Sequence, residues 1–299
     1  MKNILLTTIL SSSLILLTAC GGGSEANNND KTPIQTKENV DYTKAETIES
    51  IYEPIANLSQ QQGNIILIGT DLAESLYYGI RAGSNLRCSK GSYTKNSDKS
   101  ITFNNCEFID TVNDEGSSIT RLRIITISGS ISSKEILSSN SGRYETTLRN
   151  FKIKSSETGA LTYNGNVVSE YSSNYAKHDI TKMTFTVFDD ETQQTHQLII
   201  NNYQLISNSL SITAKGNIEG NPENKIFSVN FISDIGFESQ TAKNAFSPNY
   251  ADITIEDTNN IRNSIKISNT INNKALIRAY ADGITVTGYP KTVDWAELE

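Results

Sequence analysis

The sequence predicts a mainly β protein: a large antiparallel sheet, sandwich or open barrel built from successive hairpins, with a short helical N-terminal segment. Two observations lead to this prediction. Apolar and polar residues alternate over many short segments from residue 92 onward, and a short asparagine-containing pattern recurs along the same stretch. A parallel β-helix is the rival architecture, because two of its coils would fit within one period of that pattern.

Strict alternation predicts strands with one buried face and one solvent-facing side. Only 36% of the residues are apolar, which fits a sheet with a polar face. Turn-forming residues separate the alternating segments at 189–192, 221–222 and 257–260, and the first of these favours a hairpin over a β-helix. The alternation is clearest in segments 183–187, 210–218 and 227–231, and it continues in 253–255 and 284–286.

Three segments share a pattern in which asparagine is followed by a buried-type residue, a polar residue and an apolar residue. The aligned asparagines are roughly 50 residues apart, and a unit of that size holds two to four strands. A degraded fourth copy runs from 265 to 288. The aligned residues are Asn105, Asn150 and Asn202, and the glycines that follow them in the next strand are Gly129, Gly165 and Gly216.

The two-residue period of a strand turns this repeat into a prediction about faces. The residue after each asparagine and the residue two positions later should face the core, and the residue between them should face solvent. The predicted core positions are Cys106, Phe108, Phe151, Ile153, Tyr203 and Leu205. The predicted solvent positions are Glu107, Lys152 and Gln204.

Two helices are expected before the strands, covering an end or an edge of the sheet. Apolar residues recur at helical spacing over Thr43–Gln62, with Thr43 as the expected N-cap and Pro54 as a residue that splits the segment. A second short helix is expected over Asp71–Ile80, where Leu72 and Leu76 share a face with Ile80.

The first residues have the features of an export leader. Lys2 supplies a positive charge, and Ile4–Leu17 is an apolar run that is too short to span a bilayer. The run ends in Leu17-Thr18-Ala19-Cys20. This ending resembles the bacterial lipobox, in which a small residue precedes the cysteine that receives lipid.

The resemblance implies that the leader is removed, that diacylglycerol is attached to Cys20 and that the new amine is acylated. Several acyl chains anchor a protein stably, whereas one binds reversibly. Gly21 stands where aspartate would retain a Gram-negative lipoprotein in the inner membrane, so the resemblance implies the outer membrane, facing the periplasm or the cell surface. In a Gram-positive cell it would imply the outer face of the single membrane. As a whole the chain resembles the β-rich envelope lipoproteins of Gram-negative bacteria.

The sequence thus divides into four expected parts. Residues 1–19 are the signal peptide, 20–41 a lipidated flexible tether, 42–91 the helical segment and 92–299 the antiparallel β domain with its loose repeats. The tether is rich in glycine, asparagine and serine, and a flexible chain of this length spans roughly 25 Å.

Two cysteines remain besides the lipidated one. Cys88 and Cys106 form an even pair in an exported protein, which predicts a disulfide bond. A loop of about 17 residues closed in this way contributes roughly 3 kcal/mol in the chain-entropy account.

The sequence contains no recognised catalytic motif. A Gly-x-Ser-x-Gly elbow, a phosphate loop and a His-Glu-x-x-His helix are all missing. His178 and His196 are interpreted as solvated residues. The acidic clusters 114–115 and 189–191 are interpreted as exposed turns rather than calcium loops, so neither a metal nor a cofactor is expected. Tyrosines that could line a binding face are Tyr77, Tyr78, Tyr171 and Tyr175.

These observations lead to a functional expectation without an identified ligand. The chain is expected to be a non-enzymatic, lipid-anchored envelope protein that binds a protein or glycan partner or has a structural role. The alternatives are a polysaccharide hydrolase, which needs two paired carboxylates, and a periplasmic lipid carrier, which needs a concave apolar interior. A net charge of −7 argues against nucleic acid as a partner.

Overall fold

The computed structural model describes the chain from residue 38 to residue 298 with several internal gaps. The expected leader, Cys20 and most of the expected tether lie outside the described residues, as do the acidic clusters at 114–115 and 189–191. The described ranges are 38–60, 64–84, 86–113, 120–136, 142–155, 159–188, 195–208, 211–221, 225–236 and 250–298.

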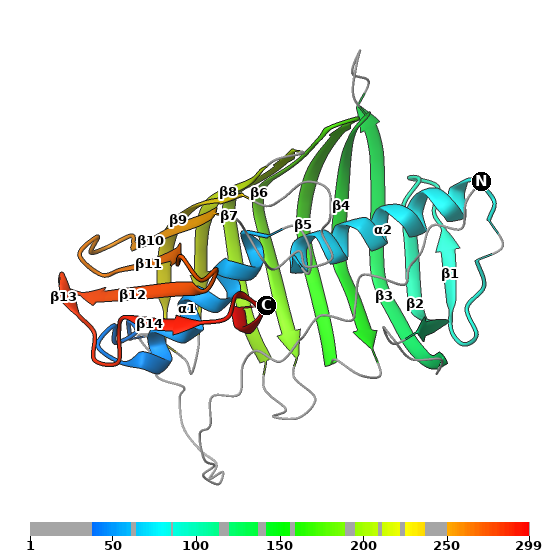
Figure 1. Cartoon of the computed structure of the whole chain (residues 1–299). Coiled ribbons are helices and arrows are strands. Elements are labelled where there is room, and N and C mark those ends of the chain that lie inside the picture. Colours follow the sequence, from blue (N-terminus) through cyan, green and yellow to red (C-terminus); the bar gives the residue numbers. More distant parts are fainter. Residues whose placement is uncertain are drawn as a thin grey trace, which may run out of the picture.

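The described strands form one open antiparallel sheet (Figure 1). It has 14 strands, and the first 13 lie in the order in which they occur along the chain, while β14 pairs with β12. The prediction of a mainly β fold made of successive hairpins is therefore confirmed. Of the predicted architectures, the described residues form the single open sheet. The strands are β1 (Ser92–Lys95), β2 (Ile101–Asn113), β3 (Thr120–Ile136), β4 (Gly142–Ser155), β5 (Gly159–Ser172), β6 (Tyr175–Phe188), β7 (Thr195–Asn208), β8 (Ser211–Gly220), β9 (Phe227–Gly236), β10 (Tyr250–Asp257), β11 (Ser264–Asn269), β12 (Ala275–Ala281), β13 (Ile284–Thr285) and β14 (Lys291–Val293).

Two α-helices and a short 3₁₀ helix cover the inner, concave face of this sheet (Figure 1). They are α1 (Ala45–Leu58), α2 (Ile65–Arg81) and η2 (Trp295–Leu298). Contacts join α2 to β3 and β4, and α1 to η2. The helices thus lie across the face of the sheet rather than at its end or edge, because the apolar side of the 14-stranded sheet needs a cover and the helices supply large apolar surfaces in the described part.

Helix α1 confirms the predicted helix but not its predicted cap. It begins at Ala45 after Lys44, whose side chain forms no capping hydrogen bond. The Thr43 hydroxyl donates instead to the Asp41 carboxylate at 2.7 Å, so the prediction of Thr43 as the N-cap is wrong. The helix also continues through Pro54, because its buried apolar stripe holds it against the core.

Helix α2 begins six residues before the expected start at Asp71. Asn64 is its N-cap, with Oδ1 accepting from the backbone N–H groups of Ile66 and Leu67 at 3.0 and 3.4 Å. The Asn64 amide also donates to the Leu58 carbonyl at 3.0 Å, which ties the two helices together. The hydroxyl of Tyr203 on β7 donates to the same Leu58 carbonyl at 2.7 Å, so the junction between α1 and α2 is attached to the sheet as well.

The three aligned asparagines share one backbone feature. Asn105, Asn150 and Asn202 have φ values of 46°, 47° and 50°, in the left-handed region that asparagine tolerates better than most residues. Each lies where two residues of one strand oppose a single residue of the next, which defines a β-bulge. The strands β2 and β4 run in the same direction, and β7 runs in the opposite one. The three segments therefore share the bulge and its flanking residues, but they do not share a strand direction within the sheet.

The predicted face pattern around these bulges is confirmed. The residues that follow the asparagines are buried, and so are Ile153 and Leu205, while Phe108 packs against the core from a partly buried position. On the opposite face Lys152 is exposed, and Glu107 and Gln204 are half-buried.

The structure contains the predicted disulfide between Cys88 and Cys106. Cys106 lies on β2, next to the edge strand β1. Backbone hydrogen bonds at 2.8 and 2.9 Å join Ser89 and Lys90 to Glu107, so the segment before β1 is fastened to β2 by covalent and hydrogen bonds together. This attachment stabilises the edge of the sheet, where unpaired backbone groups would otherwise be exposed.

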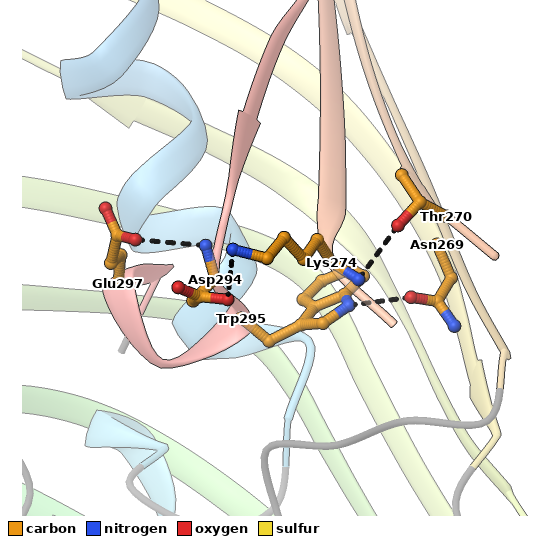
Figure 2. A network of polar contacts seen from close by, with 6 residues as sticks. All are labelled: Asn269, Thr270, Lys274, Asp294, Trp295 and Glu297. Atoms are coloured by element: carbon orange, nitrogen blue, oxygen red, sulfur yellow. Dashed lines mark hydrogen bonds and ion pairs between the residues drawn. The ribbon is translucent and has the colours of Figure 1, made fainter. Parts of the chain in front are cut away.

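The C-terminal segment docks on the hairpin formed by β11 and β12 (Figure 2). The buried Trp295 donates its indole N–H to the Asn269 side chain at 3.0 Å. Lys274 forms an ion pair with Asp294 at 3.0 Å, and the Asp294 N–H donates to the Glu297 carboxylate at 3.0 Å. These contacts hold η2 against the β11–β12 hairpin, and η2 in turn contacts α1.

Candidate functional site

A cluster of polar side chains lies between α2 and the neighbouring strands. Asp71 and Glu74 are three residues apart on α2, which places them on one side of the helix. The strands β3 to β6 supply hydroxyl groups and one imidazole from positions that face the helix. We call this set the Glu74 cluster; it consists of Asp71, Glu74, Ser133, Thr146, Ser169, Tyr171 and His178.

A chain of hydroxyl groups in this cluster ends on the Glu74 carboxylate. The Thr146 hydroxyl donates to Glu74 Oε1 at 2.8 Å, and the Tyr171 hydroxyl lies 3.5 Å from Oε2. Ser133 Oγ is 3.0 Å from Thr146 Oγ1 and 3.0 Å from the Tyr78 hydroxyl. Because the Thr146 proton is directed at the carboxylate, Ser133 donates to Thr146 and Tyr78 donates to Ser133.

His178 is part of this cluster, so the interpretation of His178 as a solvated loop residue is wrong. It lies on β6, its exposed fraction is 3%, and its Nδ1 is 3.2 Å from Ser169 Oγ. The Tyr171 ring packs edge-on against the imidazole at 5.5 Å. Burial lowers the pKa of His178 to about 4, so the ring is neutral at physiological pH. The sequence signal that was missed is the spacing of His178, which lies two residues before the apolar Ile180 and therefore on the same face of a strand.

Burial acts in the opposite direction on the two carboxyl groups. It raises the pKa of Asp71 to about 7, with a smaller contribution from the nearby Glu74 charge. The pKa of Glu74 is also raised by burial, and the hydrogen bonds from Thr146, Ser169 and Tyr171 oppose this effect. The Glu74 cluster is therefore a polar network in which every protonation change is coupled to the packing of α2 on the sheet.

The Glu74 cluster contains a serine, a histidine and a carboxylate, but not in a catalytic order. In a hydrolytic triad the carboxylate orients the histidine and the histidine faces the nucleophile. Here the Glu74 carboxylate is bound by hydroxyl groups, including that of Ser169. Ser169 is fully buried and His178 nearly so, which leaves no path for a substrate to the serine. The arrangement fixes α2 to β3, β4 and β5.

Replacing Asp71 with Asn is expected to stabilise the protein at alkaline pH. The folded-state pKa of about 7 lies above the unfolded value of 3.8, so the folded state loses stability as pH rises from about 4 to about 7. The variant lacks this loss, and we expect a gain of about 2 kcal/mol near pH 8 that disappears near pH 3. Urea unfolding at both pH values measures this gain; an equal effect at the two values would contradict a half-buried Asp71 carboxyl with a raised pKa.

A second feature is a groove of about 400 Å³ on the outer face of the sheet, over β7 to β10. Asp234 lies directly opposite Asp252 in the strand register, and Ile232 lies between Lys215 and Thr254. The Ile232 side chain is 61% exposed. The groove therefore combines two carboxylates, one ammonium group and an apolar side chain. Its lining residues are Gln204, Thr213, Ala214, Lys215, Ile232, Ser233, Asp234, Asp252 and Thr254.

The tyrosines singled out in the sequence lie near the Glu74 cluster, not near the groove. The rings of Tyr78 and Tyr144 are 5.5 Å apart, and those of Tyr144 and Tyr171 are 6.2 Å apart. Tyr77 is buried, and Tyr78 and Tyr171 direct their hydroxyl groups into the hydrogen-bonded network. Tyr175 is half-buried on β6.

The two histidines do not meet. His178 pairs with Leu205 near one end of the β6–β7 hairpin, and His196 pairs with Val187 near the other, about 30 Å away along the strands. His196 is half-buried, and its Nε2 atom is buried without a hydrogen-bond partner, so it too is not a solvated residue. Among the described residues, no group of three or more His, Cys, Asp or Glu side chains is arranged to hold a metal ion.

Comparisons with known proteins do not add a family to this description. No family model, no curated protein and no solved structure matches the chain. No helix in the described part is long and apolar enough to cross a membrane. The class that the structure itself defines is a mainly β protein in which one open antiparallel sheet is covered on its inner face by two N-terminal helices.

Proposed function

We propose that the protein is a lipid-anchored protein of the bacterial cell envelope that binds a partner protein through the outer face of its sheet. The observation that supports this proposal is the division of roles between the two faces. The inner face is occupied by the protein's own helices, whereas the outer face carries the groove over β7 to β10.

The anchor is proposed from the segment Leu17–Cys20, with residues 1–19 as the leader and the outer membrane as the site indicated by Gly21. The Cys88–Cys106 disulfide supports an exported location, because such bonds persist in oxidising compartments. A lipid-carrier role has less support. Its apolar cavity would have to lie under the helices, where side chains such as Ile51, Tyr163 and Phe185 are buried in a packed core.

The chemistry of the groove favours a protein partner over a glycan. Lys215, Asp234 and Asp252 provide charges of both signs beside the exposed Ile232, a mixture typical of protein interfaces. No aromatic side chain lines it, so the stacking platform that commonly holds a sugar ring is missing from this groove. Affinity would then come from Ile232, with the charges setting the orientation of the partner.

A polysaccharide hydrolase is the second candidate, favoured by one observation. Asp234 and Asp252 are directly opposite each other on neighbouring strands, which places their Cβ atoms roughly 5 Å apart and allows a carboxyl separation of the kind that retaining glycosidases use. Release of reducing sugar from envelope polysaccharide by the purified protein, abolished in Asp234→Asn and in Asp252→Asn, would establish this function in place of binding.

The anchor and the partner are tested together in intact cells. The Cys20→Ser variant should lose labelled palmitate and leave the membrane fraction. A photo-crosslinking residue at Ile232 should form a discrete protein adduct, and the same residue at Lys152, which is exposed on the outer face of β4, should not. Retention of palmitate by Cys20→Ser would refute the anchor. Identical crosslinking patterns at the two positions would refute the groove as the binding surface.

A further inference from the structure

The described chain begins at one particular rim of the sheet. Asn39 pairs with Ile226, just before β9, through the hydrogen bonds Val40 N–H to Ile226 O at 3.1 Å and Ile226 N–H to Glu38 O at 2.9 Å. The first described residue, Glu38, therefore lies at the rim where β9 begins. Because the strands are antiparallel, β10 and β12 end at the same rim, and β11 begins there.

Two loops at this rim are joined to each other. The turn after β10 and the turn after β12 are linked by the Gly283 N–H, which donates to the Arg262 carbonyl at 2.8 Å. The Asn260 side chain donates to the Asp282 carboxylate at 2.8 Å, and the Asp282 N–H donates to the Asn263 side chain at 2.9 Å. We call this unit, residues 258–263 with 281–285, the tether rim.

The tether rim lies next to the point where the chain arrives. The Thr258 N–H donates to the Ser228 carbonyl at 2.9 Å, two residues after Ile226. Asp257, at the base of the first loop, is close enough to Tyr42 that its charge adds to burial in raising the pKa of that phenol. The arriving chain and the two loops thus form one continuous edge, visible at the left of Figure 1 where β12 and β13 meet.

The tether rim presents two isoleucines to solvent. Ile261 is 70% exposed and Ile284 is 72% exposed. They flank the hydrogen-bonded pair Arg262–Gly283, because Ile261 precedes Arg262 and Ile284 follows Gly283. A single exposed isoleucine is common in proteins, but two on hydrogen-bonded loops beside the tether form a preformed apolar contact.

We propose that the tether rim rests on the lipid surface to which the chain is anchored, with Ile261 and Ile284 inserted between the headgroups. This inference rests on the proposed lipid anchor at Cys20. A flexible tether from Cys20 to Glu38 would span roughly 25 Å, and it would join the domain at this rim, so the rim is the part of the described domain nearest to the anchor along the chain. Nearby charges of both signs nearly balance, with four acidic and three basic groups, so the contact depends on its apolar residues rather than on anionic lipid. These charges are Glu38, Asp41, Asp257, Asp282, Lys44, Lys225 and Arg262.

The test uses the lipidated full-length protein in vesicles of phosphatidylethanolamine and phosphatidylglycerol. An environment-sensitive dye is attached to a cysteine introduced by Ile261→Cys or Ile284→Cys. Ile271→Cys is the matched control, because Ile271 is fully exposed in the loop between β11 and β12, at the opposite rim. The introduced thiol is the only free one, since Cys88 and Cys106 are bonded to each other and Cys20 carries lipid in the proposed mature form.

We expect blue-shifted emission and at least about threefold stronger quenching by spin-labelled lipid at positions 261 and 284 than at 271. Protein that floats with the vesicles while all three labels behave alike would overturn the proposed orientation and leave the anchor intact. Protein that does not float with the vesicles would overturn the anchor and the orientation together.

Discussion

The variant Phe151→Asp is expected to lose most or all of its folding stability. The Phe151 side chain is fully buried beside the Asn150 bulge, with ring centroids 6.4 Å from Phe103 and 6.5 Å from Tyr163. Removing a buried phenylalanine costs about 3–5 kcal/mol, and an unpaired carboxylate in its place adds several more. We expect a total loss of at least about 5 kcal/mol, measured as the shift in urea midpoint or as failure to fold.

The neighbouring residue provides the matched control. Lys152 points to the opposite face of the same strand and is exposed, so Lys152→Asp should cost about 0.5 kcal/mol or less. The same comparison applies on β7, where Leu205→Asp should be severe. Gln204 is a less neutral control, because its amide donates to Asp179 at 2.8 Å and an aspartate would repel that carboxylate. Equal losses for Phe151→Asp and Lys152→Asp would mean that the strand register is wrong.

A large loss of stability is also expected for the variant Gly129→Ala, by a different mechanism. Gly129 has a φ of +92°, and a Cβ atom there would overlap the backbone carbonyl of Asn150 and lie 2.8 Å from the N atom of Phe151. Backbone atoms of a neighbouring strand cannot move aside as a flexible side chain can. We expect a loss of about 3–5 kcal/mol, from backbone strain together with displacement of β4 at its bulge.

The variant Gly83→Ala distinguishes the cost of backbone strain from the cost of the steric overlap with β4. Gly83 also has a positive φ, +82°, but a Cβ atom added to it meets nothing within 4 Å. Gly83→Ala should therefore show only the conformational cost of about 1–2 kcal/mol. Guanidinium unfolding of both variants measures the difference; a loss at Gly129 no larger than that at Gly83 would contradict the close approach of β3 and β4.

The sequence by itself determined the features that depend on residues close to one another along the chain. Alternation with a period of two is a property of a single strand, so it indicated the strands and the buried faces around Phe151 and Leu205 before any pairing was known. The recurring pattern around the three aligned asparagines was also visible in the sequence, whereas the β-bulges at these residues were seen only in the structure. The disulfide followed from counting, since Cys88 and Cys106 were the two cysteines outside the expected lipobox.

Only the tertiary structure decided the features that depend on which elements become neighbours. The early start of α2 requires Asn64 to be held by Leu58 and Tyr203, and the burial of His178 depends on Ser169 and Tyr171 of the adjacent strand β5. The opposition of Asp234 and Asp252 in the groove follows from the register of β9 and β10. Hydrophobic burial is non-directional, so a local sequence pattern indicates only that one face of a strand or helix must be covered. The long-range pairing of strands and helices decides which surface covers that face.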